Sequence, residues 1–327
     1  MQAAFYERTG AARSVLVVGE LPDPHPAPGE VRVRIAVSGV NPSDVKMRGG
    51  LRSGDLPWPR IVPHSDGAGV IDEVGDGVPA SRIGERVWVW NACWGRPFGT
   101  AAEYVTLPSN QAVPLPSDVS FAAGACFGIP ALTAWYAVHM DGGCSGRDVL
   151  VTGGAGAVGH YAVQFAKAAG ARVIATVSGD AKAAIARAAG ADHVVNYRSE
   201  DVAARALELT DGSGVDRVIE VDLAANLDAA IGAVRADGDI VPYGSGALEF
   251  PVPFLPSVFK NIRYRFFIVY HLSSTDRARA VAGLTRALDA GSLQHHLGPS
   301  FALADIAAAH EAVEAGAVGN VLVTLQA

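Results

Sequence analysis

Three glycines in the middle of the chain restrict its fold more than any other feature. Gly154, Gly156 and Gly159 have the spacing G-x-G-x-x-G and lie in the run 149–178, VLVTGGAGAVGHYAVQFAKAAGARVIATVS. A short β-branched run precedes them, apolar residues at helical spacing follow them, and a second β-branched run ends the segment. Strand, glycine turn, helix and strand in this order predict a dinucleotide-binding unit.

The backbone of the glycine loop is the predicted contact with the cofactor. Glycine allows a tight turn and lets the chain approach a pyrophosphate, which then lies at the N-terminus of the following helix. We therefore expect cofactor contacts from the loop residues Gly154, Gly156, Ala157, Val158 and Gly159. A glycine turn that serves only packing is the alternative interpretation.

The end of the second strand favours NADPH over NADH. Proteins that bind NADH usually carry Asp or Glu there to accept the ribose 2′-hydroxyl, but here the strand ends in Thr-Val-Ser without an acid. Ser178 offers a hydroxyl, and Lys182 offers a positive charge that attracts a 2′-phosphate. Asp180 is interpreted as the N-cap of a helix over 181–189. A solvated Lys182 without a ligand is the alternative.

Composition and charge exclude several classes of protein. The net charge of −7 and the lack of a basic run argue against nucleic-acid binding. No apolar segment reaches the length of a membrane span, and the N-terminus does not resemble a signal peptide. Cys93, Cys126 and Cys144 are scattered, which suggests a reducing compartment. We expect a cytoplasmic protein that acts on a small molecule and binds neither nucleic acid nor membrane.

The order of strands and helices predicts an α/β protein of two domains. Strand and helix patterns alternate from 148 to 270, which predicts a doubly wound sheet. Residues 1–118 instead show short strands separated by Gly and Pro turns, typical of an all-β domain. After the second strand, the predicted strands are 193–196, 215–220, 239–243, 265–270 and 320–325, and the predicted helices are 200–209, 225–234, 275–290 and 303–315. Tyr243 and Gly244, at one strand end, are further predicted cofactor contacts.

Eight sequence runs, in order, resemble the medium-chain dehydrogenase/reductases. They are GEVRVRIAVSGVNPSDVK, PHSDGAGVIDEVGDGV, IGERVWV, GTAAEYV, GIPALTAWYAV, VLVTGGAGAVG, GADHVVNYRSED and GNVLVTL. Within that superfamily the chain is similar to the zeta-crystallin-like NADPH:quinone oxidoreductases. The resemblance implies a GroES-like β-barrel domain over 1–118, completed by about 291–327, and a Rossmann domain over 119–290.

Many members of this superfamily bind a catalytic zinc ion, and the resemblance locates their three ligand positions. The cysteine ligand position corresponds to Asn41, the histidine position to Ser65, and the third position lies near Ile129. His64 precedes the histidine position by one residue. Zinc requires three or four converging N, S or O ligands, which these three side chains do not supply. We therefore expect no catalytic metal.

The resemblance also assigns residues to the site. It implies that Asn41 lies beside the nicotinamide and orients cofactor or acceptor, with the capping of the turn before Pro42 as the alternative. Thr133 matches a position near the nicotinamide, and Tyr197 matches a tyrosine that packs near the 2′-phosphate.

Two positions differ from the family pattern. Relatives commonly have tyrosines that flank the acceptor, and this chain has Lys46 and Arg52 in their places. Two cations predict a site that prefers anionic or strongly polar acceptors. The alternative is that both are solvated loop charges.

These observations predict a reductase. A quinone or an α,β-unsaturated carbonyl accepts hydride without a Lewis acid, because the charge is delocalised onto a carbonyl oxygen. The expected function is NADPH-dependent, zinc-independent reduction of such an acceptor. An enoyl reductase of acyl thioesters and a non-catalytic NADPH-binding protein are the alternatives. The resemblance further implies a homodimer joined through the sheet edge at 264–270.

Overall fold

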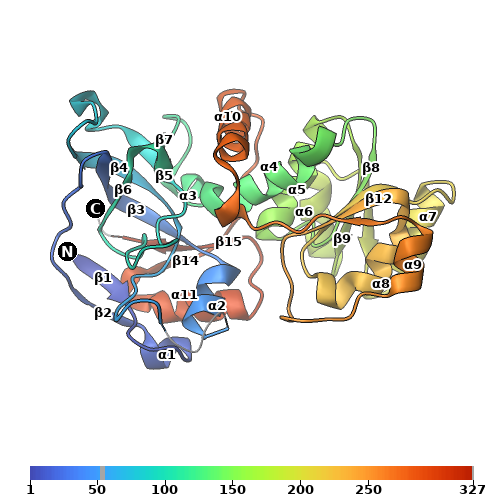
Figure 1. The fold of residues 1–327 in the computed structure, drawn as a ribbon, viewed down its shortest axis with the longest axis horizontal. Helices are drawn as coiled ribbons and strands as arrows, with labels where there is room; N and C mark the ends of the chain where they lie inside the picture. The colour runs from blue at the N-terminus through green and yellow to red at the C-terminus, as the bar shows by residue number, and fades with distance from the viewer. Residues whose placement is uncertain (52–55, 326–327) are drawn as a thin grey trace. The chain divides into compact units, whose positions relative to one another are not determined.

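The described part of the chain divides into two compact units (Figure 1). The computed structural model describes residues 1–51 and 56–325. The first unit comprises residues 1–129 and the segment from His295 onward, and the second unit comprises residues 130–294. The expected boundaries, at 118/119 and 290/291, lie slightly N-terminal to these. Each helix in the described residues is too short or too polar to span a lipid bilayer.

The first unit is built on a mainly antiparallel sheet. Its strand order is β14-β15-β3-β4-β5-β7, with β6 paired to the first half of β3, and β1 and β2 form a separate pair. The strands are β1 (Gln2–Phe5), β2 (Val17–Glu20), β3 (Glu30–Val40), β4 (Asp66–Val74), β5 (Arg86–Val89), β6 (Tyr104–Pro108), β7 (Ala112–Pro114), β14 (Leu297–Ala302) and β15 (Asn320–Thr324). Because β15 pairs antiparallel with β3, the C-terminal segment completes the N-terminal sheet.

Alternating residues of β3 form the core of the first unit. Val31, Val33 and Ile35 are buried and pack in one apolar cluster with Val87 and Leu107 from neighbouring strands. This is the period of two that a sheet with one buried face requires. The helices of this unit are α1 (Ala12–Val15), α2 (Pro42–Arg48), α3 (Phe121–Gly124) and α11 (Ile306–Glu314), and a π-helical turn, Phe127–Ala131, ends at the boundary with the second unit.

The second unit contains a parallel sheet in the order β10-β9-β8-β11-β12-β13. Its strands are β8 (Asp148–Val151), β9 (Arg172–Val177), β10 (His193–Asn196), β11 (Val215–Glu220), β12 (Val234–Pro242) and β13 (Arg263–Tyr264). The direction of the strand order reverses between β8 and β11, and the glycine loop directly follows β8. In doubly wound sheets, ligands bind outside the carboxyl ends of the strands at this point.

Helices cover both faces of the parallel sheet (Figure 1). The helices are α4 (Leu132–His139), α5 (Ala157–Ala168), α6 (Asp180–Ala188), α7 (Val202–Leu209), α8 (Leu223–Ala233), α9 (Phe254–Phe259) and α10 (Ser274–Asp289). Helix α5 packs against α4 and α6, and α7 packs against α8. Buried residues such as Leu150, Ile174 and Val218 join Leu223 and Ile231 of α8 in one apolar cluster.

The predicted last strand of the sheet, 265–270, is wrong. The ladder with β12 comprises only Arg263 and Tyr264, and the backbone N–H of Arg265 makes one more hydrogen bond to it. The chain then leaves the sheet, because the Phe267 ring packs against Tyr136 at 5.0 Å between centroids. The following turn, Val269–His271, is 3₁₀-helical. The apolar run 265–270 therefore does not continue the strand, because its side chains pack outside the sheet.

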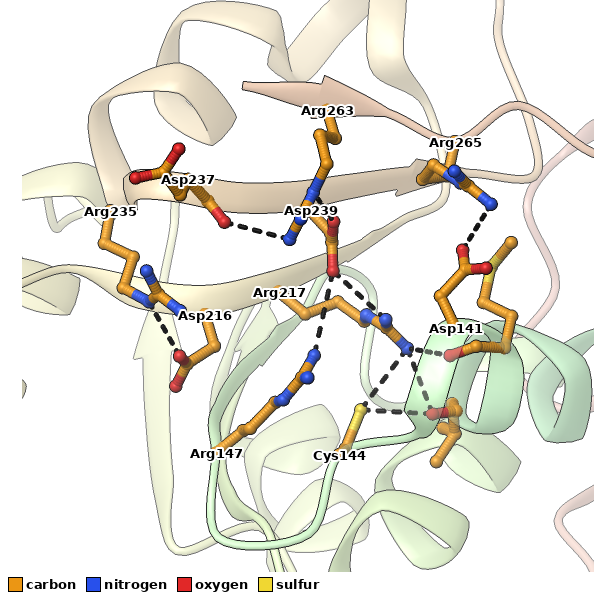
Figure 2. A network of polar contacts seen from close by, with 12 residues as sticks. Asp141, Cys144, Arg147, Asp216, Arg217, Arg235, Asp237, Asp239, Arg263 and Arg265 are labelled. Atoms are coloured by element: carbon orange, nitrogen blue, oxygen red, sulfur yellow. Dashed lines mark hydrogen bonds and ion pairs between the residues drawn. The ribbon is translucent and has the colours of Figure 1, made fainter. Parts of the chain in front are cut away.

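A buried ion network is centred on Arg217 of β11 and Asp239, its neighbour on β12 (Figure 2). Arg217 is fully buried and donates to Asp239 at 3.1 Å and to the carbonyl oxygens of Ala137, Val138 and Met140 at the end of α4. Arg263 donates to the other oxygen of Asp239 at 2.7 Å. The network thus joins β11, β12 and β13 to the end of α4, and the Asp239 carboxylate at its centre is paired on both oxygens.

Candidate functional site

The glycine loop connects β8 to α5 by close backbone packing. A Cβ atom on Gly154 would lie 2.7 Å from the Cβ of Ala175, and one on Gly159 would lie 2.1 Å from the carbonyl oxygen of Gly153. Gly153 itself has φ +66°, the left-handed region that favours glycine. The loop therefore requires glycine at these positions for its own packing, and Gly153, outside the motif, makes the left-handed turn.

Helices α5 and α6 begin without a side-chain cap. Their N-cap residues are Gly156 and Gly179, and neither helix start has a side-chain hydrogen bond. In contrast, Asp201 and Asp222 cap α7 and α8 through their carboxylates. The first N–H groups of a helix need acceptors, and the helix dipole favours negative charge there. The starts of α5 and α6 are therefore suited to phosphate groups.

The residues predicted to contact a 2′-phosphate lie near the ends of β9 and β10. Ser178 follows β9, and Lys182 lies in the first turn of α6, where it is half-buried. The backbone N–H of Tyr197 donates to the carbonyl oxygen of Val177 at 3.1 Å, so Tyr197 lies beside the end of β9. Its side chain is exposed. Contact of these residues with a phosphate stays a prediction.

The predicted cap at Asp180 is wrong. Helix α6 starts at Asp180 itself, the N-cap is Gly179, and no side chain accepts a hydrogen bond there. Because the chain turns at the glycine, Asp180 becomes the first helical residue. In that position its charge interacts favourably with the helix dipole without capping the helix.

A cavity of about 300 Å³ opens at the carboxyl ends of β8, β9 and β11. Its polar lining includes Thr152, Thr176, Glu220 and Asn226, and Tyr197 lies at its wall. The Thr176 hydroxyl accepts the N–H of Gly153 at 3.1 Å, and the Thr152 hydroxyl accepts the N–H of Val221 at 2.9 Å. The cavity is thus contiguous with the glycine loop and is lined by groups that can bind a polar ligand.

Glu220 ends β11, and Tyr243, a predicted cofactor contact, follows the neighbouring strand β12. One Glu220 oxygen accepts from the Asn226 amide at 2.8 Å and from the Asp222 N–H at 2.6 Å. In the described residues, the other oxygen and the buried Tyr243 hydroxyl have no hydrogen-bond partner. Burial raises the pKa of the Glu220 carboxyl and of the Tyr243 phenol. Gly244 packs closely, because a Cβ there would lie 2.2 Å from the Val221 oxygen.

In the first unit, Asn41 has both a capping role and a side-chain partner. It is buried at the start of α2, and its backbone N–H donates to Asp44 at 2.7 Å. Its side-chain Nδ2 donates to Asp66 Oδ2 at 2.8 Å. The Asp44 carboxylate thus accepts the backbone N–H of Asn41 at the start of α2.

Asp66 also contacts Ile129, the residue that the resemblance assigns to the third zinc-ligand position. Its Oδ2 atom accepts the backbone N–H of Ile129 at 3.1 Å, so one carboxylate oxygen joins Asn41 to Ile129. Ser65, the second such position, is buried immediately before Asp66. In the described residues, no group of three His, Cys, Asp or Glu side chains is arranged to hold a metal ion.

The remaining predicted site residues are Lys46, Thr133 and Arg52. Lys46 is half-buried on α2, and Thr133 is buried in the first turn of α4 in the second unit. Arg52 lies outside the described residues.

Burial raises the pKa of the Cys93 thiol to about 12 and also raises that of Cys126, so both stay protonated at neutral pH.

His64 belongs to a buried chain of hydrogen bonds. The Thr100 hydroxyl donates to the Asp66 carbonyl oxygen, so the Ser38 hydroxyl donates to Thr100 at 2.7 Å and accepts from His64 Nδ1 at 2.8 Å. His64 Nε2 then accepts from His310 Nε2 at 2.9 Å. Burial lowers the pKa of both histidines, which keeps the pair neutral.

Sequence patterns missed Asp66, Glu220 and Gly153. An acid directly after the β-branched pair Val218 and Ile219 was the available signal for Glu220, and the consecutive glycines 153 and 154 were the signal for Gly153. Asp66 gave no local signal, because its partners are distant in sequence.

Two protein families match the two parts of the chain. The "Alcohol dehydrogenase GroES-like domain" family matches residues 27–117, and the "Zinc-binding dehydrogenase" family matches residues 157–285. An alcohol dehydrogenase of Geobacillus stearothermophilus is 31% identical, over 80% of this chain and 83% of its own length. A 2-haloacrylate reductase of Burkholderia sp. is 32% identical, over 88% of this chain and 87% of its own length.

A solved structure shows the same fold with a cofactor. The quinone oxidoreductase of Escherichia coli complexed with NADPH matches with a TM-score of 0.88 and 25% identity, covering 99% of this chain and all of the other. The glycine loop, the parallel sheet and the β-rich first unit agree with this match. The chain belongs to the medium-chain dehydrogenase/reductase superfamily, as a GroES-like and a Rossmann domain that together form an oxidoreductase with a nicotinamide cofactor.

Proposed function

We propose that this oxidoreductase uses NADPH to reduce a quinone or an α,β-unsaturated carbonyl compound, without zinc. The choice of NADPH is supported by the uncapped starts of α5 and α6 and by the lack of an acid at the end of β9. The acceptor part is supported by the likeness to a quinone oxidoreductase and to a 2-haloacrylate reductase, because haloacrylate also contains a conjugated double bond.

The NADPH-binding residues are proposed from chemistry and position. The N–H groups at the start of α5 would bind the pyrophosphate, and Lys182 with Ser178 would bind the 2′-phosphate. Tyr197, next to the end of β9, would pack against the adenosine. Tyr243 and Gly244 follow β12, at the same carboxyl edge of the sheet.

Bound NADPH supplies a hydride from C4 of the nicotinamide. The protein must then orient the acceptor and stabilise negative charge on its carbonyl oxygen. Asn41 is the proposed orienting residue, since its amide has one end fixed by Asp66. Lys46 would favour an anionic acceptor such as a haloacrylate, and Arg52 is proposed with it from the sequence alone.

The absence of zinc is proposed from the residues at the three ligand positions. Asn41 donates its amide to a carboxylate, Ser65 is a weak zinc ligand, and Ile129 has no ligand atom in its side chain. Purified protein is expected to contain no stoichiometric zinc and to keep its activity in a strong chelator. Elemental analysis that finds one zinc per chain, lost together with activity, would show that the ligands lie elsewhere.

The test of the function is turnover with a panel of quinones and enones, and with NADPH deuterated at C4. Deuterium is expected in the reduced product. Asn41→Ala is expected to lower kcat about tenfold to a hundredfold, with NADPH affinity nearly unchanged. Asn320→Ala is a matched control, because Asn320 is equally buried and donates its amide once, to His296. If the wild type reduces no member of the panel, the proposed function is wrong.

A homodimer through the sheet edge at 264–270 is part of the proposal. Strand β13 is the edge of the parallel sheet, and Phe266 and Ile268 next to it are 64% and 40% exposed. Exposed edges with apolar side chains favour pairing between copies. Light scattering is expected to give twice the chain mass of 33.8 kDa; a monomer at micromolar concentration would contradict this assembly.

A further inference from the structure

Asp66 connects three segments of the first unit that are distant in sequence. It is the first residue of β4 and is fully buried. Its Oδ2 atom accepts from Asn41 Nδ2, at the end of β3, and from the backbone N–H of Ile129, in the π-helical turn. A buried carboxylate is stable only when such donors satisfy it. Asp66 is therefore held by the same groups that it positions.

The backbone around Asp66 is shaped to admit its carboxylate. A Cβ atom on Gly128 would lie 2.3 Å from Asp66 Oδ1 and 2.8 Å from the carbonyl oxygen of Val89. Only glycine at this position lets the π-helical turn approach so closely. Pro130 lies inside the turn and lacks an N–H group, which interrupts regular α-helical hydrogen bonding. Short π-helical turns of this kind are frequent at functional sites.

The carboxylate determines which way the Asn41 amide faces. An ionised carboxylate only accepts hydrogen bonds, whereas an amide has a donor end and an acceptor end. If the Asn41 amide flipped, its oxygen would face Asp66 Oδ2, and two acceptors would meet at hydrogen-bond distance. The donor end of Asn41 is thus fixed toward Asp66, and the carbonyl oxygen is fixed on the opposite side.

We propose that Asp66 is the positioning residue of Asn41: its carboxylate fixes the orientation of the Asn41 amide that the reduction requires. This inference rests on the proposed function, because it assigns Asp66 a role only through Asn41. In zinc-binding relatives a metal ion would hold the corresponding three positions together; here a carboxylate oxygen joins two of them. Asp66 does not touch the substrate in this proposal.

The experiment is a double-mutant cycle on kcat, KM and NADPH affinity, the last measured by fluorescence titration. Asp66→Ala is expected to lower kcat about tenfold and to leave NADPH affinity within about twofold of wild type. In the Asn41→Ala background, the same substitution is expected to change kcat by less than about twofold, because there is no amide left to orient. Asp66→Asn, which keeps the size and one acceptor oxygen, is expected to recover part of the rate.

Asp44 provides the matched control. Its carboxylate also binds Asn41, but through the backbone N–H. Asp44→Ala should lower the thermal midpoint through the lost cap, and its effect on kcat should be the same with or without the Asn41 side chain. If Asp66→Ala unfolds the protein, Asp66→Asn takes its place in the cycle.

The outcomes separate the two proposals. If the wild type is active and the effects of the Asp66 and Asn41 substitutions on kcat multiply in the double variant, the positioning role is overturned. The proposed function is then unaffected. A loss of NADPH affinity that matches the loss of rate also overturns it, because it indicates a general structural defect. Wild-type protein that reduces no acceptor overturns both.

Discussion

Strands β11 and β12 carry two groups of polar side chains, one before and one at their carboxyl ends, and the two groups differ in how those side chains are paired. In the first group, Asp239 binds Arg217 and Arg263 with its two oxygens, and Arg217 also binds the carbonyl oxygens that end α4 (Figure 2). At the carboxyl end, one oxygen of Glu220 and the hydroxyl of Tyr243 lack partners in the described residues. The two groups lie only three residues apart on β11.

This difference separates a structural network from a site prepared for a ligand. A buried polar atom without a partner costs about 1–3 kcal/mol, so such atoms are rare unless something else binds there. Glu220 lines the cavity beside the glycine loop, whereas Arg217 and Asp239 are not among its lining residues. We expect substitutions in the paired network to lower stability, and a neutral substitution at Glu220 to raise it.

The largest effect is expected from Arg217→Met. Removal of the arginine leaves Asp239 and three carbonyl oxygens with fewer donors, and breaking a buried pair in this way costs about 3–5 kcal/mol. Urea unfolding should show the loss, with NADPH affinity of the remaining folded protein unchanged. Asp239→Asn should act in the same direction. A change of less than about 1 kcal/mol in both variants would mean that the network does not support the fold.

The next largest effect is expected from Lys182→Ala, measured as cofactor binding. A lost charge-assisted contact with the 2′-phosphate should weaken NADPH binding by about 1.5–3 kcal/mol and NADH binding little. Lys167→Ala is the matched control, because Lys167 lies in the last turn of α5, toward the amino ends of the strands, and pairs with Asp192. Equal affinity of the wild type for both cofactors would remove the basis for this assignment.

Glu220→Gln is expected to have a smaller effect, opposite in sign to that of Asp239→Asn. Burial raises the pKa of Glu220, so the ionised carboxyl destabilises the folded state above that pKa, and the penalty is absent below the ordinary glutamate value. The glutamine variant should therefore become more stable relative to wild type as the pH rises through this window, by about 1 kcal/mol. Urea unfolding between about pH 4 and pH 8 measures this, and a difference that does not vary with pH would contradict it.

The smallest effect is expected from Arg265→Gln. Arg265 pairs with Asp141 at 2.5 Å, but both side chains are more than 40% exposed. Exposed pairs contribute about 0–1 kcal/mol, so the unfolding free energy should change by less than about 0.5 kcal/mol. A larger loss of unfolding free energy would mean that this surface pair stabilises the fold together with the Arg217 network.

The glycine loop and the strands around it could be predicted from the sequence because they are local. Gly154, Gly156 and Gly159 and the strands on either side lie within one short segment, and β10 and β11 have the predicted bounds. Periodicity reports local structure directly. The end of the sheet at Tyr264 was not predictable, because packing of Phe267 on a distant helix decided it.

The sequence by itself determined the order of strands and helices and the glycine loop, and the family resemblance assigned Asn41, Ser65 and Ile129 to the expected zinc-ligand positions. Only the tertiary structure decided that Asp66 binds Asn41 and Ile129, which are 25 and 63 residues away from it. It also decided which polar side chains of β11 and β12 are paired. The physical reason is that repeating patterns record which face of an element is buried, whereas a polar side chain's partner depends on how separate elements pack together.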